Sequence, residues 1–212
     1  MKTAKSATLD GFEALSVAVE ASFSKALPAF SIIGLGNTSI QESKERVKSA
    51  LLFINFKFPP LKITVNLSPS EISKSGSHFD LPIALLIALQ NENVSFDDFY
   101  IFGELGLDGK LKDSDSIFVL ILSLVKQDKI KKVLVPKESI EKIKNLPNIE
   151  IFAVETLQEA IEFFKNNDYE SAKISKSHEI SEKFIEIYGT KYYQNNNFEL
   201  DFIDILGQTF AK

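Results

Sequence analysis

The chain has 212 residues and carries 24 Lys and Arg against 29 Asp and Glu, which gives a formal net charge of -5 at pH 7. This balance argues against a uniformly basic nucleic-acid-binding domain, and the absence of Cys excludes disulfides, thiolate metal sites and thiol catalysis. No apolar run approaches the roughly 20 residues that span a bilayer. We therefore expect no membrane contact and a cytoplasmic location.

The first third of the chain predicts a hairpin, a third strand and a helix. Apolar and polar residues alternate on both sides of the turn at Asp10-Gly11, so 6–9 and 14–23 are expected to pair as antiparallel strands. Pro28 separates them from a strand over 29–35. Residues 39–55 then carry apolar side chains at helical spacing, with the chain's only arginine, Arg46, one turn after Glu42.

The stretch from Ile63 to Leu89 organises the rest of the chain. It begins as a strand of alternating β-branched residues, crosses a Ser-rich loop from Ser68 to His78, and enters the apolar run 79–89. That run is too long for an ordinary strand and predicts a buried helix, with Asp80 in its first turn. A strand, a loop of small residues and a buried helix can hold a nucleophile or an anion.

Strands and helices then alternate up to residue 166. The pattern predicts a strand over 99–105 with a hairpin turn at 107–110, a buried helix over 117–125, a strand over 131–135, a short helix over 137–145, a strand over 149–154 and a helix over 156–166. Polar residues dominate 167–200, which is typical of a linker, and 201–212 become apolar again. The fold class predicted is α+β, a two-layer mixed sheet with packed helices.

The Ser-rich loop offers an anion-binding site. Lys74, Gly76 and Ser77, with the free N–H groups at the start of the following helix, are the candidates, although Asp80 would oppose an anion there. No metal site is expected. His78 and His178 are the only histidines, and the acids at 108, 113 and 115 lack the Gly and Glu of a calcium loop.

Several ordered blocks together resemble the ComM/YifB family of magnesium-chelatase-like AAA+ ATPases. They read SATLDGFEALSVAVE at 6–20, FSIIGLGNTSIQESKERVKSAL at 30–51, ITVNLSPSEISKSGSHFDLPIAL at 63–85, FGELGLDGKLK at 102–112 and DFIDILGQTFAK at 201–212. The resemblance implies an N-terminal domain at 1–166 like the Lon proteolytic domain (a ribosomal protein S5 domain 2-like fold), a linker at 167–200, and the start of a truncated AAA+ module at 201–212.

For the intact protein, the resemblance implies an ATP-driven motor that promotes DNA branch migration during natural transformation as a ring-shaped homo-oligomer, a hexamer. ATP and Mg²⁺ are the cofactors implied there, whereas no G-x-x-x-x-G-K-[ST] pattern occurs in these residues. We expect no nucleotide site and no cofactor in this chain. It would serve as a non-catalytic assembly and interaction domain whose partners are its own AAA+ module and neighbouring subunits.

Two alternatives remain open for the domain itself. A Lon-like peptidase would need a nucleophile two residues after the loop glycine, where His78 stands, so only Ser77 in a shifted register could serve. Phe118 and Leu120 occupy the helix positions where Lon-like enzymes carry lysines. The other alternative is a DNA-contacting module that uses Lys57, Lys62, Lys74 and the lysines between 126 and 132.

Overall fold

The computed structural model describes residues 2–11, 13–34, 36–167 and 169–174, together with the backbone of a separate hairpin at 184–187 and 190–193. The chain divides into a unit of residues 1–175 and a unit of residues 176–212. The hairpin, β10 (Phe184–Ile187) with β11 (Thr190–Tyr193), belongs to the second unit and lies within the predicted linker. The predicted division at 166 and 200 stays a prediction. Residues 201–212 lie outside the described part.

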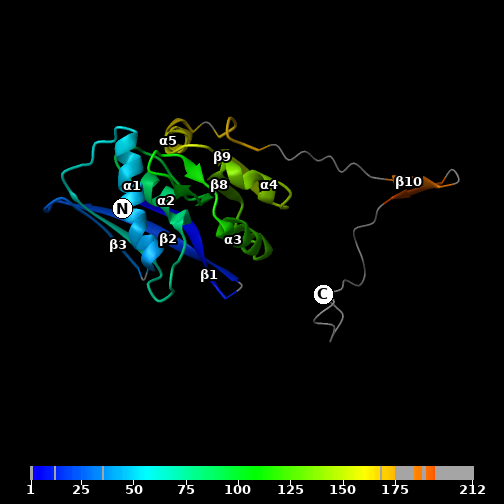
Figure 1. The fold of residues 1–212 in the computed structure, drawn as a ribbon, viewed down its shortest axis with the longest axis horizontal. Helices are drawn as coiled ribbons and strands as arrows, with labels where there is room; N and C mark the ends of the chain where they lie inside the picture. The colour runs from blue at the N-terminus through cyan, green and yellow to red at the C-terminus, as the bar shows by residue number, and fades with distance from the viewer. Residues whose placement is uncertain are drawn as a thin grey trace. The chain divides into compact units, whose positions relative to one another are not determined.

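Seven strands and five helices of the first unit build one sheet and its cover (Figure 1). The strands are β1 (Lys2–Asp10), β2 (Glu13–Ser24), β3 (Ala29–Ile33), β4 (Lys62–Ser68), β5 (Phe99–Ile101), β8 (Lys132–Pro136) and β9 (Glu150–Val154). The longer helices are α1 (Thr38–Phe53), α2 (Asp80–Ala88), α3 (Asp115–Lys126) and α5 (Leu157–Asn166). The short α4 (Ile140–Ile143) follows a 3-10 turn at Lys137–Ser139, and another 3-10 turn, Ser77–Phe79, precedes α2.

The seven strands form a mixed sheet in the order β3-β4-β2-β1-β5-β8-β9. Only β2 is antiparallel to its neighbours, because the β1–β2 hairpin turns at Asp10-Gly11, as predicted. The other neighbouring pairs are parallel. Consequently the carboxyl ends of β3, β4, β1, β5, β8 and β9 meet at one edge of the sheet. In parallel sheets that edge is where ligand-binding loops gather.

The predicted α+β class and mixed sheet are confirmed, but the prediction of two layers is wrong for half of the sheet. Strands β8 and β9 are apolar on both faces, so Val133 and Leu134 belong to opposite hydrophobic clusters. Helices α1, α2 and α5 cover one face, while α3 and α4 cover the other over β1, β5, β8, β9 and the part of β2 around Ala14. Such doubly covered strands are typical of parallel sheets. The far face of β3, β4 and the rest of β2 is mostly polar and bears the Asn66–Glu20 hydrogen bond at 2.9 Å.

Phenylalanine fills much of the core. The ring of Phe99 lies 5.3–5.5 Å from those of Phe152, Phe163 and Phe164, mostly edge to face. This geometry suits aromatic quadrupoles and adds to the burial of apolar area. These ring contacts hold α5 against β5 and β9, in the half of the sheet that α1 does not cover.

One predicted strand is in fact two. The expected strand over 99–105 divides into β5 and the short β6 (Glu104–Leu105), which pairs with β7 (Leu111–Lys112) through the predicted turn. Between them the backbone leaves the sheet. The N–H of Gly103 donates to the carbonyl of His78 and the N–H of Leu81 donates to the carbonyl of Gly103, at 3.0 Å each. The start of α2 therefore takes up the hydrogen bonds that a continuous strand would have used.

Gly34, at the end of β3, is expected to tolerate no side chain. Its φ is +109°, and a Cβ there would lie 2.2 Å from the carbonyl oxygen of Leu67. We expect Gly34→Ala to lower the free energy of unfolding by about 3 kcal/mol or more. Gly11 is the matched control, since its φ is +60° and no atom lies within 4 Å of an added Cβ.

Gly11→Ala should therefore lower the free energy of unfolding by only about 1 kcal/mol, because the left-handed backbone conformation is the only source of strain there. Urea unfolding of both variants measures the difference. Equal losses for the two variants would contradict the close approach of β3 to β4 at Gly34.

Candidate functional site

The polar loop between β4 and α2 lies at the carboxyl edge of the sheet, where the sequence placed it. The predicted strand, loop and buried helix are all present, as β4, residues 69–79 and α2. Seven of the eight α2 residues after Asp80 are buried, and only Ala88 is partly exposed. The loop is anchored to the start of α1, because the N–H of Asn37 donates to the carbonyl of Lys74 at 3.0 Å.

Lys74, the first anion-site candidate, is buried. Its side chain is among the largest fully buried ones, and its Nζ donates to the carbonyl of Pro69 within the same loop. Burial lowers the pKa of the Lys74 ammonium because the charged form loses hydration. Lys74 therefore closes its own loop from within and presents no charge on the surface.

Gly76 and Ser77, the other two candidates, are also bonded to protein groups. The N–H of Gly76 donates to Oγ of Ser39 at 3.1 Å, and Oγ of Ser77 donates to the carboxylate of Glu104. Gly76 has a φ of +107°, and a Cβ there would lie 2.6 Å from Nδ1 of His78, so the position requires glycine. The three candidates share one loop but do not converge on a common ligand position, and the anion site stays a prediction.

His78 is a satisfied core histidine. Its Nε2 lies 2.9 Å from the carbonyl of Ala7 and its Nδ1 lies 3.2 Å from Oγ of Ser116. Because a carbonyl only accepts, Nε2 carries the proton, and Nδ1 of the neutral ring accepts from Ser116. Burial lowers the pKa of His78 to about 4, and its hydrogen bond with Ala7 opposes this shift. The ring joins β1, the loop and α3.

An ion pair that the sequence did not predict lies at the centre of this region. Asp80 has no exposed surface, and its Oδ2 and Oδ1 accept from Nε and Nη2 of Arg46 at 2.6 and 3.2 Å. The N–H of Leu105 donates to the same carboxylate at 3.2 Å. Arg46 also pairs with Glu42 at 3.6 Å, the predicted contact.

Arg46 also donates hydrogen bonds within α1. Its Nη2 donates to the carbonyl of Ser39 and to Oγ of Ser43, both at 3.0 Å. The hydrogen bond with Asp80 raises the pKa of Arg46. Burial raises the pKa of the Asp80 carboxyl, and the hydrogen bonds from Arg46 and Leu105 oppose that rise. The sequence did contain a signal for this ion pair. A lone arginine on a helix that otherwise carries lysines indicates a position that needs a bidentate donor.

The geometry does not give Ser77 the lysine that a Ser–Lys nucleophile requires. Its hydroxyl donates to the carboxylate of Glu104, and the ammonium group of Lys74 donates to the carbonyl of Pro69. In α3, Leu120 is fully buried and Phe118 packs against the core, so neither position offers a base. The bonded polar groups of this region hold α1, α2, α3 and β6 together.

The other candidate lysines and acids lie elsewhere. Lys129, Lys131 and Lys132 line a hollow of about 380 Å³ with Lys5 at the amino ends of β1, β5 and β8, so they do not share a surface with the buried Lys74. Asp113 is held by Ser139 and Lys142 at 2.6 Å each. Among the described residues, no three His, Asp or Glu side chains gather as a metal site would need. None of the described helices is long and apolar enough to cross a bilayer.

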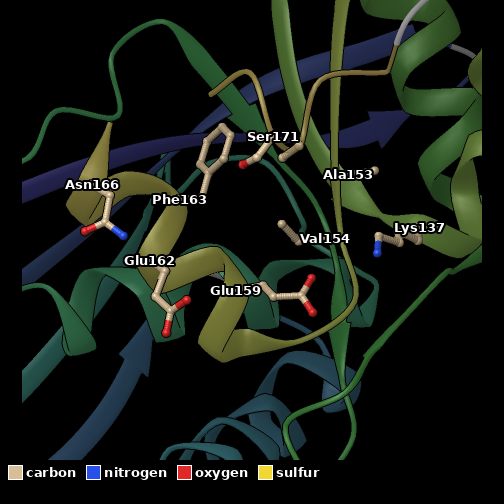
Figure 2. A pocket seen from close by; sticks show the side chains of 9 residues that line it. Lys137, Ala153, Val154, Glu159, Glu162, Phe163, Asn166 and Ser171 are labelled. Atoms are coloured by element: carbon tan, nitrogen blue, oxygen red, sulfur yellow. The ribbon is translucent and has the colours of Figure 1, made fainter. Parts of the chain in front are cut away.

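A second hollow lies between α5 and β9 (Figure 2). It has a volume of about 300 Å³ and an apolar wall that includes Val154 and Phe163. Figure 2 shows Glu159 and Glu162 on α5, with Lys137 across the hollow. Lys137 is paired with Glu155 at 2.9 Å, and Glu159 accepts from the N–H of Glu155 at 2.9 Å. These charges are used to fix the start of α5 against β9.

Comparison with known proteins decides the family. Residues 19–139, which span α1, the polar loop and α2, match the model of a family described as subunit ChlI of Mg-chelatase. The chain belongs to the magnesium-chelatase-like ComM/YifB family. It is 28% identical over 205 residues to Competence protein ComM of Haemophilus influenzae, covering 95% of this chain and 38% of that protein.

Further members of the ComM/YifB family match shorter stretches. Uncharacterized protein YifB of Escherichia coli is 31% identical over 136 residues, which is 63% of this chain and 26% of that protein. The corresponding YifB of Salmonella typhimurium is 34% identical over 105 residues, which is 48% of this chain and 21% of that protein. The chain thus spans between a fifth and two fifths of the length of these curated relatives.

The buried pair of Arg46 and Asp80 is expected to dominate the stability of this region. Arg46→Met leaves a buried carboxylate without its partner and should lower the free energy of unfolding by about 3–5 kcal/mol. Glu42→Gln, which removes only the exposed partner of Arg46, should change it by less than about 0.5 kcal/mol. Urea unfolding at neutral pH compares them. If both variants lost the same stability, the pair with Asp80 would not be the important one.

The neutral state of His78 makes stability depend on pH. Its pKa is about 4 in the folded chain and about 6.5 when unfolded, so the unfolded state binds more protons between these values. The contribution of His78 is complete above pH 6.5 and is lost as the pH falls towards 4. We expect the protonation of His78 to lower the free energy of unfolding by about 2 kcal/mol between pH 7 and pH 5.

The difference between the pH profiles of the wild type and His78→Gln isolates this contribution from that of Asp80. NMR titration of the imidazole measures the same pKa without a variant. A ring that titrates near pH 6.5 would contradict its burial.

Proposed function

We propose that this chain is the N-terminal, non-catalytic assembly and interaction module of a magnesium-chelatase-like AAA+ ATPase. One observation carries the proposal: the side chains of Lys74, Ser77, His78 and Asp80 are all bonded to protein groups at the one place where a nucleophile or ligand was expected. Such an arrangement stabilises a fold, and it gives the Ser77 hydroxyl no lysine base. The strand, loop and helix order supports, as part of the proposal, a domain of the Lon proteolytic type.

For the intact protein, we propose an ATP-driven DNA branch-migration motor that acts in natural transformation as a cytoplasmic hexamer. The match to a protein named for competence supports the process, and the match to a magnesium-chelatase subunit supports ATP and Mg²⁺ as cofactors. The described residues do not fit a Mg²⁺–nucleotide site, since they contain no phosphate-binding loop pattern and no cluster of metal ligands. Within the proposal, ATP and Mg²⁺ bind to the AAA+ module.

The proposed assembly role is tested on the intact protein with and without residues 1–166. Deletion should raise the protein concentration at half-assembly by about tenfold or more, which corresponds to about 1.4 kcal/mol of lost interface free energy. Analytical ultracentrifugation with ATP measures the assembly, and exchange of branched DNA strands measures the motor.

Ser77→Ala in the intact protein is the control, and it should retain both activities. Unchanged assembly after the deletion would contradict the assembly role. A fluorophosphonate adduct on Ser77 of the folded chain, or peptide hydrolysis that Ser77→Ala abolishes, would replace this proposal with the peptidase alternative.

A further inference from the structure

The two edge strands of the seven-stranded sheet, β9 and β3, differ in whether further backbone pairs with them. At β9, the segment of residues 172–174 lies alongside the edge. The N–H of Ala153 donates to the carbonyl of Ala172 at 2.9 Å, and the N–H of Ile174 donates to the carbonyl of Ile151 at 2.8 Å. The chain thus closes this edge with its own extended backbone, a common protection for sheet edges.

The opposite edge, β3, is bare and uncharged. Within the described part of the chain, no backbone hydrogen bond joins β3 to any strand other than β4. Its sequence is AFSII, with none of the lysines or prolines that usually blunt an edge strand. Ile33 is 53% exposed at its end. An edge of this kind is a template for one more strand.

A cavity of about 250 Å³ with a partly apolar wall opens beside this edge, between β3, α1 and the segment that leads into β4. Phe30, Phe58, Pro59 and Ile63 form much of its wall. Leu27, Ile33, Leu52 and Phe53, four of the six exposed large hydrophobic residues found in the described part, belong to β3, α1 or the turn before β3. The exposed apolar surface is therefore concentrated in this part of the chain.

Two lysines at the cavity carry no ion pair. Lys44 and Lys48 lie one turn apart on α1, and neither makes a salt bridge within the described residues. Glu45 is the single acid in the lining. Two adjacent ammonium groups repel each other on a helix, and an acidic side chain placed between them would relieve this. The position therefore favours an incoming carboxylate.

We propose that the β3 edge docks an extended segment of a partner protein, one with alternating apolar side chains and an acidic residue. The segment pairs with β3 through backbone hydrogen bonds and so extends the seven-stranded sheet. Residues 172–174 pair with β9 in the same manner at the other edge. One apolar side chain enters the cavity, and the acidic side chain reaches Lys44 and Lys48. Backbone pairing supplies affinity in this mode of recognition, and the alternate side chains supply specificity. This inference rests on the proposed interaction role of the domain and assigns that role to the β3 edge.

The test is an NMR titration of the 212-residue chain with a blocked synthetic peptide of alternating valine and threonine around one central glutamate. The amide signals of Ala29–Ile33 should shift, and those of β9 should not. Lys44→Glu with Lys48→Glu should weaken binding about tenfold, as expected for two exposed charge pairs. Lys129→Glu with Lys131→Glu, at another surface, is the matched control and should bind as the wild type does.

Two further variants separate the backbone edge from the charges. Ile33→Lys places a charge on the edge and should abolish binding. Val119→Lys, at another exposed apolar position on α3, should not. A peptide with N-methyl groups on alternate residues cannot pair and should not bind.

Absence of any shift up to about 1 mM peptide would overturn the proposal. So would shifts confined to other strands, or β3 signals that change with protein concentration alone, which would make a second copy of the chain the occupant. The titration requires no assembled ring, so its failure is distinct from a failure of the assembly test.

Discussion

The buried contact between Arg46 and Asp80 is the constraint on which the rest of this domain depends. A carboxylate without any exposed surface is costly, and only a fully satisfied arrangement makes it tolerable. Arg46 supplies two donors from α1 and the backbone of Leu105 supplies a third from β6. Three segments far apart in the sequence are thereby fixed in one geometry around the first turn of α2.

The polar loop next to this contact follows the same logic. Lys74 is folded back onto Pro69, Ser77 onto Glu104, and His78 onto Ala7 and Ser116. Each bond replaces hydration that burial removed, so the loop is a polar joint between the sheet and its helices. The sequence predicted a possible nucleophile or anion site at these residues. Here their hydrogen bonds stabilise the fold.

If the loop is structural, the surface of the domain is the place to look for function. The β9 edge is closed by the chain's own backbone, while β3 keeps an open and uncharged edge beside a cavity with a partly apolar wall. The unpaired Lys44 and Lys48 add a preference for acidic partners. This asymmetry fits a module that holds another chain, as we propose for a member of the ComM/YifB family.

The sequence by itself determined the elements and the family. Alternation predicted the β1–β2 hairpin and β4, and the apolar run predicted α2, because local periodicity reflects which face is buried. The helix predicted over 156–166 is α5, and Oγ1 of Thr156 caps its start by accepting from the N–H of Glu159 at 3.2 Å. Ordered blocks of residues indicated the family that comparison then established.

Only the tertiary structure decided how the polar residues are used. In the sequence, a lysine in a Ser-rich loop and an aspartate at the start of the following helix look the same whether they face solvent or the core. Their burial depends on segments 30 or more residues away. Asp80 meets Arg46 across 34 positions, and His78 meets Ala7 across 71. The division of the predicted strand at 99–105 has the same origin, since the start of α2 captures the backbone of Gly103. Long-range hydrogen bonds of this kind leave no periodic trace in the chain.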